Sequence, residues 1–492
     1  MVSIPSNSLP EKISELAVQS ARRWPDKIAL RENEETTTFS ELQTSIDNLH
    51  EEMTAAGVGG ESMVGVMGAN SRAFVAAAFA ASACGAVVMP MAARLSRNEM
   101  DEIFSTCALD FILQIDDMAL SDHASGSALF ERSLFGRRLR LWPMRRHSHS
   151  HNPRELVSDA AFIRFTSGTT GKAKGVILSH RAIIERTQCA NRGLGLDEND
   201  TVLWVLPMAY HFFVSIVLYV RYGCEIVISH ASVAEDLLDA IIANRATLLY
   251  AAPMHYRMLA EESSERRFSA LKTAISTSSS LPRETARQFQ ERYGLPITQA
   301  YGIIEVGLPF INVGHRDDRP MSIGAPLPDY EAALFDEEGR LKEKDAEGEL
   351  GIRGPGMFSA YLNPPSPREK VLRENFFMTG DYARQNADGA WSIVGRKKSV
   401  IIVGGQKVYP EEVESVINHF PGVATSRAYG VGHPRMGEVV EAELVPTDPA
   451  SPPDAEALIN HCVKRLSNMQ APQRVHIVDQ IAQTPSGKIA RH

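Results

Sequence analysis

The stretch Phe165-Thr166-Ser167-Gly168-Thr169-Thr170-Gly171-Lys172-Ala173-Lys174-Gly175 is the one around which the chain is organised. It contains three glycines, two lysines and four hydroxyl side chains. Apolar residues precede it and follow it, so the sequence predicts a loop between two strands. Glycines let backbone N–H groups turn toward an anion, hydroxyls donate hydrogen bonds and lysines add positive charge. This composition predicts that the loop binds a polyphosphate.

The loop differs from the Walker A motif of ordinary P-loop nucleotidases. That motif needs a glycine five residues before Gly171, where this chain has Thr166. It also needs a serine or threonine after the lysine, where this chain has Ala173. An ordinary kinase or P-loop ATPase is therefore disfavoured. The interleaved lysines also argue against a simple surface turn.

Length and composition limit the class of protein. A chain of 492 residues is long enough for two or more domains. A net charge of −9 gives no support for non-specific nucleic-acid binding. The five cysteines are dispersed and form no CxxC pair or Cys/His metal spacing, which suits buried thiols in a reducing compartment.

Two segments bear on location. Residues 1–7 lack a basic region followed by an apolar core, so we expect no signal peptide. Residues 74–91 are apolar and just long enough to span a membrane, but they are rich in alanine and contain Gly85 and Pro90. A buried helix leading into a buried strand is the better interpretation. We therefore expect a cytoplasmic protein with no membrane span.

Strands alternate with helices through the first two thirds of the chain. A buried strand at 63–67, a helix beginning after Ser71 and a strand ending at Met89 are typical of this pattern. It indicates βαβ units and a mostly parallel sheet. Further on, strands at 202–207, 274–281 and 297–302 end in polar or aromatic loops, and ligands bind outside such strand ends.

The pattern changes near Ile323, where short alternating strands predict a small β-rich unit. After Arg396 the sequence predicts a compact α+β segment of roughly 95 residues, an ordinary size for a small domain. The expected fold is therefore α/β. A large N-terminal core domain (1–396) holds βαβ-type sheets and the β-rich unit, and a small mobile domain (397–492) follows.

The run Arg137–His151 interrupts the pattern. Five arginines alternate with apolar residues, and His147, His149 and His151 follow. Such a run could bind nucleic acid or an acidic partner, and the histidines could bind a metal. A solvated connector leading into the strands of the phosphate loop is the favoured interpretation.

Four further motifs occur after the phosphate loop. They are Gln299-Ala300-Tyr301-Gly302-Ile303-Ile304-Glu305, Thr379-Gly380-Asp381, Gly395-Arg396-Lys397-Lys398 with Gly404–Glu414, and Pro485-Ser486-Gly487-Lys488-Ile489. In this order and spacing the five motifs resemble those of the adenylate-forming superfamily. That superfamily includes acyl- and aryl-CoA synthetases, adenylation domains of peptide synthetases and firefly-type luciferases. The resemblance covers nearly the whole chain.

The resemblance implies a reaction in two halves. A carboxylate attacks the α-phosphate of ATP and gives an acyl-adenylate and pyrophosphate. A thiol then displaces AMP to give a thioester. The implied cofactors are ATP, Mg²⁺ and CoA, or the phosphopantetheine of a carrier protein in place of CoA.

The resemblance also implies roles for the residues of the nucleotide site. The β- and γ-phosphates would be held by Thr166, Ser167, Gly168, Thr169, Thr170, Gly171 and Lys172, with Lys172 preferred to Lys174 as the main cation. Tyr301, beside Gly302, would offer an aromatic face to adenine. Asp381 and Arg396 would hold the ribose, since an ionised carboxylate accepts hydrogen bonds from both hydroxyls.

Three residues are implied to serve catalysis and motion. Glu305 would be an oxygen ligand of Mg²⁺. Lys488 would reach in from the C-terminal domain and stabilise the charge that accumulates during attack. Lys398 falls at the expected hinge, about which the small domain would rotate between the half-reactions.

One departure from the superfamily pattern affects the phosphate chemistry. Ile304 stands where a hydroxyl residue usually precedes the glutamate. A hydrogen bond to the α-phosphate is then missing, which would cost about 1–3 kcal/mol if nothing replaces it. This bears on the adenylation rate more than on the reaction type.

The acid pocket is expected around His211, which the resemblance also makes a catalytic candidate. Phe212 replaces the aspartate of amino-acid-activating members and the asparagine of dihydroxybenzoate-type members, so an acid with an uncharged tail is expected. Thr277, Ser278 and Ser279 replace a stretch usually rich in glycine and alanine. We expect a shorter or more polar pocket for a short- or medium-chain or small aryl acid.

The sequence leaves the acceptor open. An acyl-CoA ligase is the leading hypothesis, and an acyl-carrier-protein ligase acting on a separate carrier is close behind. A luciferase-type oxygenase is less favoured. A non-catalytic member that keeps the fold is the alternative from another class, and Ile304 is the only hint of it.

Overall fold

The predicted phosphate loop joins two antiparallel strands in the middle of a mixed sheet. The computed structural model describes residues 11–117, 120, 123–145, 150–166, 174–312, 322–342, 347–482 and 489. In chain position the loop follows β8 (Ala160–Thr166) and precedes β9 (Lys174–Ser179), which pair from Ala160↔Ser179 to Thr166↔Lys174. The prediction of two strands flanking the loop is therefore confirmed, and the structure adds that the two strands are antiparallel.

The sheet that holds this hairpin has nine strands. Its order is β20 (Ser366–Pro367), β19 (Ala360–Tyr361), β9, β8, β4 (Val87–Ala92), β3 (Met63–Gly68), β5 (Phe111–Ile115), β7 (Arg137–Pro143) and β6 (Phe130–Leu134). The central strands β8, β4, β3 and β5 run parallel, and antiparallel strands close both sides.

The helices of the N-terminal part, except the first, begin after a serine or threonine whose side chain caps the helix. They are α1 (Ile13–Arg23), α2 (Phe39–Ala55), α3 (Arg72–Ala83) and α4 (Arg97–Thr106). Thr38 and Glu41 form a capping box at α2, and the Ser71 hydroxyl accepts from the Phe74 N–H at α3. Helix α3 is buried all round, as its alanine-rich sequence requires. Within the described ranges, no helix is long and apolar enough to cross a membrane.

A second sheet of eight strands carries most of the predicted ligand-binding strand ends. Its order is β15 (Gly307–Ile311), β14 (Ile297–Ile303), β13 (Thr273–Ser276), β12 (Leu248–Ala251), β10 (Thr201–Trp204), β11 (Glu225–Ile228), β1 (Ile28–Glu32) and β2 (Glu35–Thr38). The strands from β14 to β1 are parallel. Alternate residues face two hydrophobic clusters: Trp204 and Tyr250 belong to the large central one, Leu203 and Leu249 to a smaller one.

Helices cover both faces of this sheet. They are α5 (His180–Leu194), α6 (Met208–His211), α7 (Val217–Arg221), α8 (Ala234–Ala243), α9 (Pro253–Glu261) and α10 (Arg283–Tyr293). A π-helical turn at Phe212–Ile216 joins α6 to α7. The short 3₁₀ turns are η1 (Pro153–Glu155), η3 (Arg368–Lys370) and η4 (Lys397–Ser399).

The predicted small β-rich unit is an antiparallel sheet of five strands. Its order is β16 (Ser322–Gly324), β22 (Trp391–Arg396), β21 (Phe377–Gln385), β18 (Glu347–Arg353) and β17 (Glu331–Phe335).

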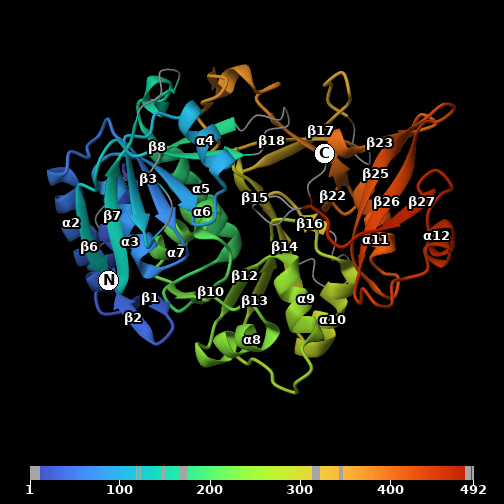
Figure 1. Ribbon diagram of the computed structural model, residues 1–492, viewed down its shortest axis with the longest axis horizontal. Helices are drawn as coiled ribbons and strands as arrows, with labels where there is room; N and C mark the ends of the chain where they lie inside the picture. Colours follow the sequence, from blue (N-terminus) through green and yellow to red (C-terminus); the bar gives the residue numbers. More distant parts are fainter. Residues whose placement is uncertain are drawn as a thin grey trace.

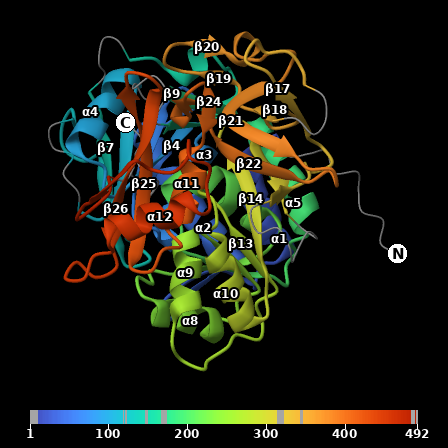
Figure 2. The ribbon, with the colours of Figure 1, turned by 90° about the vertical axis from the view of Figure 1, so that its right-hand side faces the viewer.

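The last part of the chain has its own sheet and its own core. The strands are β23 (Ile401–Val403), β24 (Gln406–Val408), β25 (Val423–His433), β26 (Gly437–Pro446) and β27 (Arg474–Ile477), with helices α11 (Pro410–Ile417) and α12 (Ala455–Val463). A separate hydrophobic cluster spans Ile401 to Ala471. This unit lies at one end of the molecule beside α9 and α10, at the right in Figure 1 and in front in Figure 2. The large α/β part and the small α+β part confirm the predicted fold class.

The prediction of a solvated connector at 137–151 is wrong over the first half of that segment. Residues 137–143 form β7, which pairs with β5 and β6. Leu139 and Leu141 are fully buried, while Arg138 and Arg140 project from the opposite face and pair with Asp117 and Glu131. The arginines thus form the polar face of a strand. Residues 146–149, which include His147 and His149, lie outside the described ranges.

Candidate active site

Tyr301, Asp381 and Arg396, predicted to hold adenosine, lie in direct contact. The Tyr301 hydroxyl donates to Asp381 Oδ2 at 2.6 Å, and Arg396 Nε lies 3.0 Å from Asp381 Oδ1. Tyr301 comes from β14, whereas Asp381 and Arg396 face each other across β21 and β22. Two sheets therefore build this cluster, and Tyr301 is 80 positions from Asp381 in the chain.

Asp381 is buried, and its carboxylate is held by Tyr301 and Arg396. It is 3% exposed, and its own N–H donates to Thr379 Oγ1 at 3.1 Å. Burial and the Asp381 charge raise the pKa of Tyr301 well above its usual range, so the phenol remains a donor. The Arg396 side chain is half-exposed, at 51%. Ionised carboxylate oxygens have lone pairs left for ribose hydroxyls.

Glu305 lies in the turn between β14 and β15 and is positioned by three residues not singled out from the sequence. The Tyr361 hydroxyl donates to Glu305 Oε1 at 3.0 Å. Arg186 donates to the carbonyl of Ile304 at 3.1 Å, and the Phe358 N–H donates to the carbonyl of Glu305 at 2.7 Å. Burial lowers the pKa of Arg186 to about 10. No local motif predicts these contacts, because Tyr361 and Glu305 are 56 positions apart.

The surroundings of Glu305 fit a magnesium ion that is bound together with phosphate. In the described part of the chain, no group of three or more His, Cys, Asp or Glu residues could hold a metal. Tyr361 engages one carboxylate oxygen of Glu305, and the side chain is partly exposed. Magnesium is commonly held by one or two carboxylates plus substrate phosphates and water. A lone positioned carboxylate suits that arrangement.

One described end of the phosphate loop lies beside Tyr361, the residue that donates to Glu305. Thr166 ends β8 and is partly exposed, and Lys174 begins β9. Lys174 Nζ lies 4.9 Å from the centre of the Tyr361 ring, a cation–π distance. Ser167, Gly168, Thr169, Thr170, Gly171 and Lys172 lie outside the described residues, as does Lys488. Their predicted roles remain predictions.

The residues expected to form the acid pocket are only partly brought together. His211 ends α6, and its ring centre lies 5.6 Å from that of Trp204 and 6.4 Å from that of Tyr250. Trp204 and Tyr250 stack at 6.0 Å, and a hydrogen bond links Tyr250 to Thr277. His211 and Thr277 therefore flank the same aromatic pair.

The structure does not place the other expected pocket residues, Phe212, Ser278 and Ser279, beside this aromatic pair. Phe212 is 1% exposed and packs against Phe74 and Phe79 of α3, within the central core. Ser278 has a φ of +76°, a conformation that favours glycine, and Ser279 is exposed. The π-helical turn that begins at Phe212 changes the helical register just after His211, and such turns often occur at functional sites.

Gly302 and Lys398 complete the set of predicted residues. Gly302 is exposed beside Tyr301, and a Cβ atom there would lie 2.7 Å from the carbonyl of Gly307, so a larger residue would not fit. Lys398 is exposed in η4, between β22 and the C-terminal sheet. Its neighbour Lys397 donates to Glu349 Oε2 at 2.6 Å.

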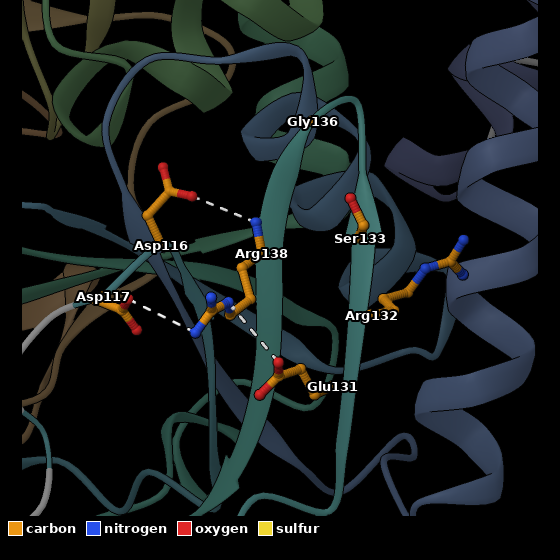
Figure 3. A pocket seen from close by; sticks show the side chains of 7 residues that line it. All are labelled: Asp116, Asp117, Glu131, Arg132, Ser133, Gly136 and Arg138. Atoms are coloured by element: carbon orange, nitrogen blue, oxygen red, sulfur yellow. Dashed lines mark hydrogen bonds and ion pairs between the residues drawn. The ribbon is translucent and has the colours of Figure 1, made fainter.

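A cavity elsewhere belongs to a different part of the molecule (Figure 3). It is lined by Asp116, Asp117, Glu131, Arg132, Ser133, Gly136 and Arg138. Its strands β6 and β7 lie at the edge of the nine-stranded sheet, and β4, β3 and β5 separate them from β8. Arg138 pairs with Asp117 and Glu131, so these charges neutralise one another and we assign no site there.

Solved structures show which fold this chain has. ATP-bound MatB from Rhodopseudomonas palustris matches with a TM-score of 0.80 at 23% identity, covering 97% of both chains. The o-succinylbenzoate CoA synthetase (MenE) from Bacillus subtilis, in complex with its acyl-adenylate intermediate, matches with a TM-score of 0.81 at 24% identity, covering 96% of both chains. The fold is that of the adenylate-forming enzymes.

The sequence then gives the family. The model of the AMP-binding enzymes matches residues 18–362, and that of the AMP-binding enzyme C-terminal domain matches residues 412–488. The chain belongs to the family of AMP-binding enzymes. It is 28% identical to a feruloyl-CoA synthase of Amycolatopsis over 96% of both chains. It is 27% identical to an indoleacetate–CoA ligase of Aromatoleum aromaticum, over 98% of this chain and 97% of that protein.

Proposed function

We propose that this protein is an ATP-dependent acid–CoA ligase that forms AMP. It activates a carboxylic acid as acyl-AMP and transfers the acyl group to CoA as a thioester. The observation that carries the proposal is the Tyr301–Asp381–Arg396 cluster beside the Tyr361–Glu305 pair. The first suits a nucleoside and the second a magnesium ion bound to phosphate, at the strand ends where α/β sheets bind ligands.

In the proposed mechanism this chain mainly orients the reactants. Asp381 accepts hydrogen bonds from the ribose, while Tyr301 and Arg396 hold that carboxylate in place. Magnesium bound at Glu305 would neutralise phosphate charge. The loop from Thr166 to Gly175 holds the departing pyrophosphate, and Lys488 stabilises the charge between the carboxylate and the α-phosphate. Positioning and electrostatics supply most of the catalysis in such transfers.

The proposed acid is short- or medium-chain or small aryl. Aromatic surface at the expected pocket comes from Trp204, Tyr250 and His211. The Thr277 hydroxyl is hydrogen-bonded to Tyr250. Among the relatives, feruloyl-CoA synthase and indoleacetate–CoA ligase carry aryl acids in their names. Long-chain-fatty-acid–CoA ligases also match, at 25–30% identity. A small aryl acid therefore heads the panel to be tested.

CoA is the proposed acceptor, because these relatives are named for CoA thioesters. A carrier protein acting in trans is the alternative left by the sequence. The domain division at residue 396, the hinge at Lys398 and a cytoplasmic location are parts of the same proposal. The separate hydrophobic cluster from Ile401 to Ala471 supports the division.

The test is a panel assay with the purified full chain. Ferulate, indoleacetate, benzoate, sulfoacetate and straight-chain acids from C2 to C16 are incubated with ATP and Mg²⁺. Each mixture receives CoA, phosphopantetheinylated carrier protein or no thiol, and pyrophosphate, AMP and thioester are measured. We expect thioester with CoA and a small aryl acid. Absence of acid-dependent pyrophosphate with every acid would contradict the function, and highest efficiency with C14–C16 acids would contradict the acid class.

A further inference from the structure

Arg164 carries a positive charge that the proposed mechanism does not yet use. It lies on β8, two residues before Thr166, and strand alternation puts both side chains on the same face of the sheet. Arg164 Nη1 donates to the carbonyl of Tyr210 at 2.6 Å, and the guanidinium lies 5.1 Å from the centre of the Tyr210 ring. Tyr210 directly precedes His211. Arg164 therefore lies between the phosphate loop and the expected acid pocket.

The guanidinium of Arg164 is short of partners. Among the described residues, its hydrogen bond goes to a neutral carbonyl, and its Nε is buried without a partner. The charge of Glu305 acts on Arg164, but no ion pair joins them in the described part of the chain. Burial lowers the pKa of Arg164. A buried guanidinium without an anion is unfavourable, so proteins pair such groups with a carboxylate or phosphate.

We propose that Arg164 binds an oxyanion of the reactants at this centre. The oxyanion is either the carboxylate of the acid or a non-bridging oxygen of the α-phosphate, and both present the same acceptor chemistry. This inference rests on the proposed function, because it adds a residue to that site. Ile304 brings no hydroxyl to the centre, so Arg164 is an added donor there.

Three features favour a reactant over a purely structural role. Arg164 is partly exposed as a residue, although its Nε is buried. Thr166 on the same face leads into the phosphate loop, and Glu305 is close enough for its charge to act on Arg164. A guanidinium can bind a carboxylate or phosphate through two parallel hydrogen bonds, and only one Arg164 nitrogen is engaged by a described acceptor.

The chain offers a matched control in Arg154. Its side chain is also partly exposed, its Nε is also buried without a partner, and it donates to the carbonyls of Ser158 and Gly85. It lies in η1, before β8, at the opposite end of that strand from the phosphate loop. Arg154→Met therefore measures the loss of a carbonyl-bound arginine away from the site.

The experiment compares wild type with Arg164→Met, Arg164→Lys and Arg154→Met by calorimetric titration. The probes are AMP, adenosine and each acid of the panel. If Arg164 binds the α-phosphate, Arg164→Met weakens AMP binding by about tenfold or more and leaves adenosine binding unchanged. If it binds the carboxylate, the affinity for the acid falls by a similar factor and that for AMP does not. Arg164→Lys should recover part of either loss.

Steady-state kinetics adds a second readout in the active protein. The KM of the matching reactant should rise more than kcat falls. The inference is overturned if Arg164→Met and Arg154→Met give equal affinities for AMP and for every acid. Binding does not require turnover, so a protein that makes no pyrophosphate contradicts the proposed function without deciding the role of Arg164.

Discussion

At the scale of single residues, the candidate site consists of carboxylates held by phenol groups. Tyr301 donates to Asp381 and Tyr361 donates to Glu305. A phenol beside a carboxylate keeps its proton, because burial and the negative charge raise its pKa. Each carboxylate is therefore held in a fixed direction by a phenol hydroxyl before any ligand binds. Such preorganisation lowers the cost of binding a nucleotide and a metal.

Replacing Asp381 by asparagine tests the ribose contact. The change removes the charge opposite Arg396 and one set of acceptor lone pairs, and charge-assisted hydrogen bonds are worth about 1.5–3 kcal/mol. We expect the KM for ATP to rise about tenfold or more, with a smaller change in the KM for the acid. Asp388→Asn, in the exposed turn of the same hairpin, is the control. An unchanged KM for ATP would remove Asp381 from the site.

Tyr361→Phe tests whether the phenol positions Glu305 for a cation. The ring and its contact with Lys174 remain, and only the hydroxyl that donates to Glu305 is lost. We expect the half-saturating Mg²⁺ concentration to rise about threefold to tenfold, as for loss of one hydrogen bond of about 1 kcal/mol. Binding of Mn²⁺ to the complex with a non-hydrolysable ATP analogue, followed by electron paramagnetic resonance, gives a readout independent of turnover.

Tyr293→Phe is the matched control for that experiment. Its hydroxyl donates to the carbonyl of Leu259 at 3.0 Å, far from Glu305 in the cluster around α9 and α10. Both variants lose one partly buried phenol hydroxyl. Equal metal dependence in the two would mean that Tyr361 only supports the fold.

At the scale of elements, β7 shows how a strand with basic residues is tied into the sheet. Arg137 donates to Glu32 Oε1 at 2.7 Å, and Glu32 also accepts from the Arg72 N–H at 3.0 Å and lies 3.3 Å from His230. Glu32 belongs to β1 of the eight-stranded sheet, and Arg137 belongs to the nine-stranded one. This carboxylate therefore links the two large sheets and the N-terminus of α3.

Glu32→Gln should make that link measurable through pH. Burial alone would raise the pKa of Glu32. Hydrogen bonds from His230, the Arg72 N–H and Arg137 together outweigh burial and bring the pKa down to about 2. A depressed folded-state pKa stabilises the protein above the ordinary value of 4.5, and this contribution is lost as the pH falls toward 2. We expect Glu32→Gln to cost about 2–3 kcal/mol at pH 7.

Urea unfolding from pH 7 down to pH 3 provides the measurement. The difference in unfolding free energy between wild type and Glu32→Gln should shrink as the pH falls below about 4.5. Glu34→Gln, at an exposed position in the same β1–β2 hairpin, should show little difference throughout. A constant difference between wild type and Glu32→Gln at all pH values would contradict the assigned pKa.

Elements were predictable where the signal was local. The helix after Ser71 was predicted from the sequence, and it begins there because the Ser71 side chain accepts a hydrogen bond from the Phe74 N–H. The error at β7 has a physical cause. Leu139 and Leu141 alternate with arginines as in a strand, but Arg138 and Arg140 were assigned to solvent. They pair instead with carboxylates of neighbouring segments.

At the scale of the whole molecule, the order of the motifs predicted which residues share a site, but not the contacts between those residues. Ordered motifs placed Tyr301 and Asp381 in one site, yet the hydrogen bond between them depends on how two sheets pack. Tyr361, Arg186 and Arg164 carried no motif, so only the assembled fold reveals their positions. The position of Phe212 could not be predicted from the sequence either, because it depends on how its ring packs against Phe74 and Phe79 of α3.

The small C-terminal part is attached to the β-rich unit through polar contacts beside the predicted hinge. Lys397 pairs with Glu349, Lys407 pairs with Glu337, and Tyr409 donates to Glu347. A rotating domain would have to break such contacts, and polar contacts break at lower cost than a packed apolar interface. The proposed division at residues 396 and 397 places the hinge directly beside the Lys397–Glu349 pair.

Glu349→Gln tests this arrangement without altering the hinge sequence. Glu349 is 7% exposed, and loss of its charge removes an ion pair of 2.6 Å that holds Lys397. We expect trypsin to cleave after Lys397 or Lys398 about threefold faster or more, because an exposed segment opens more often when its anchor is lost. Both lysines remain available to the protease, so mass spectrometry of the fragments reports directly on the hinge.

The control is Glu331→Gln, which removes an ion pair with Arg353 at 2.6 Å within the same sheet and away from the hinge. A general loosening of the sheet would accelerate cleavage in both variants, whereas release of the hinge accelerates it only in Glu349→Gln. If first cleavage fell well away from residues 397–400, the boundary at 396 would be wrong. Equal rates in wild type and Glu349→Gln would mean that the Lys397–Glu349 pair does not restrain the C-terminal part, and that other contacts hold it.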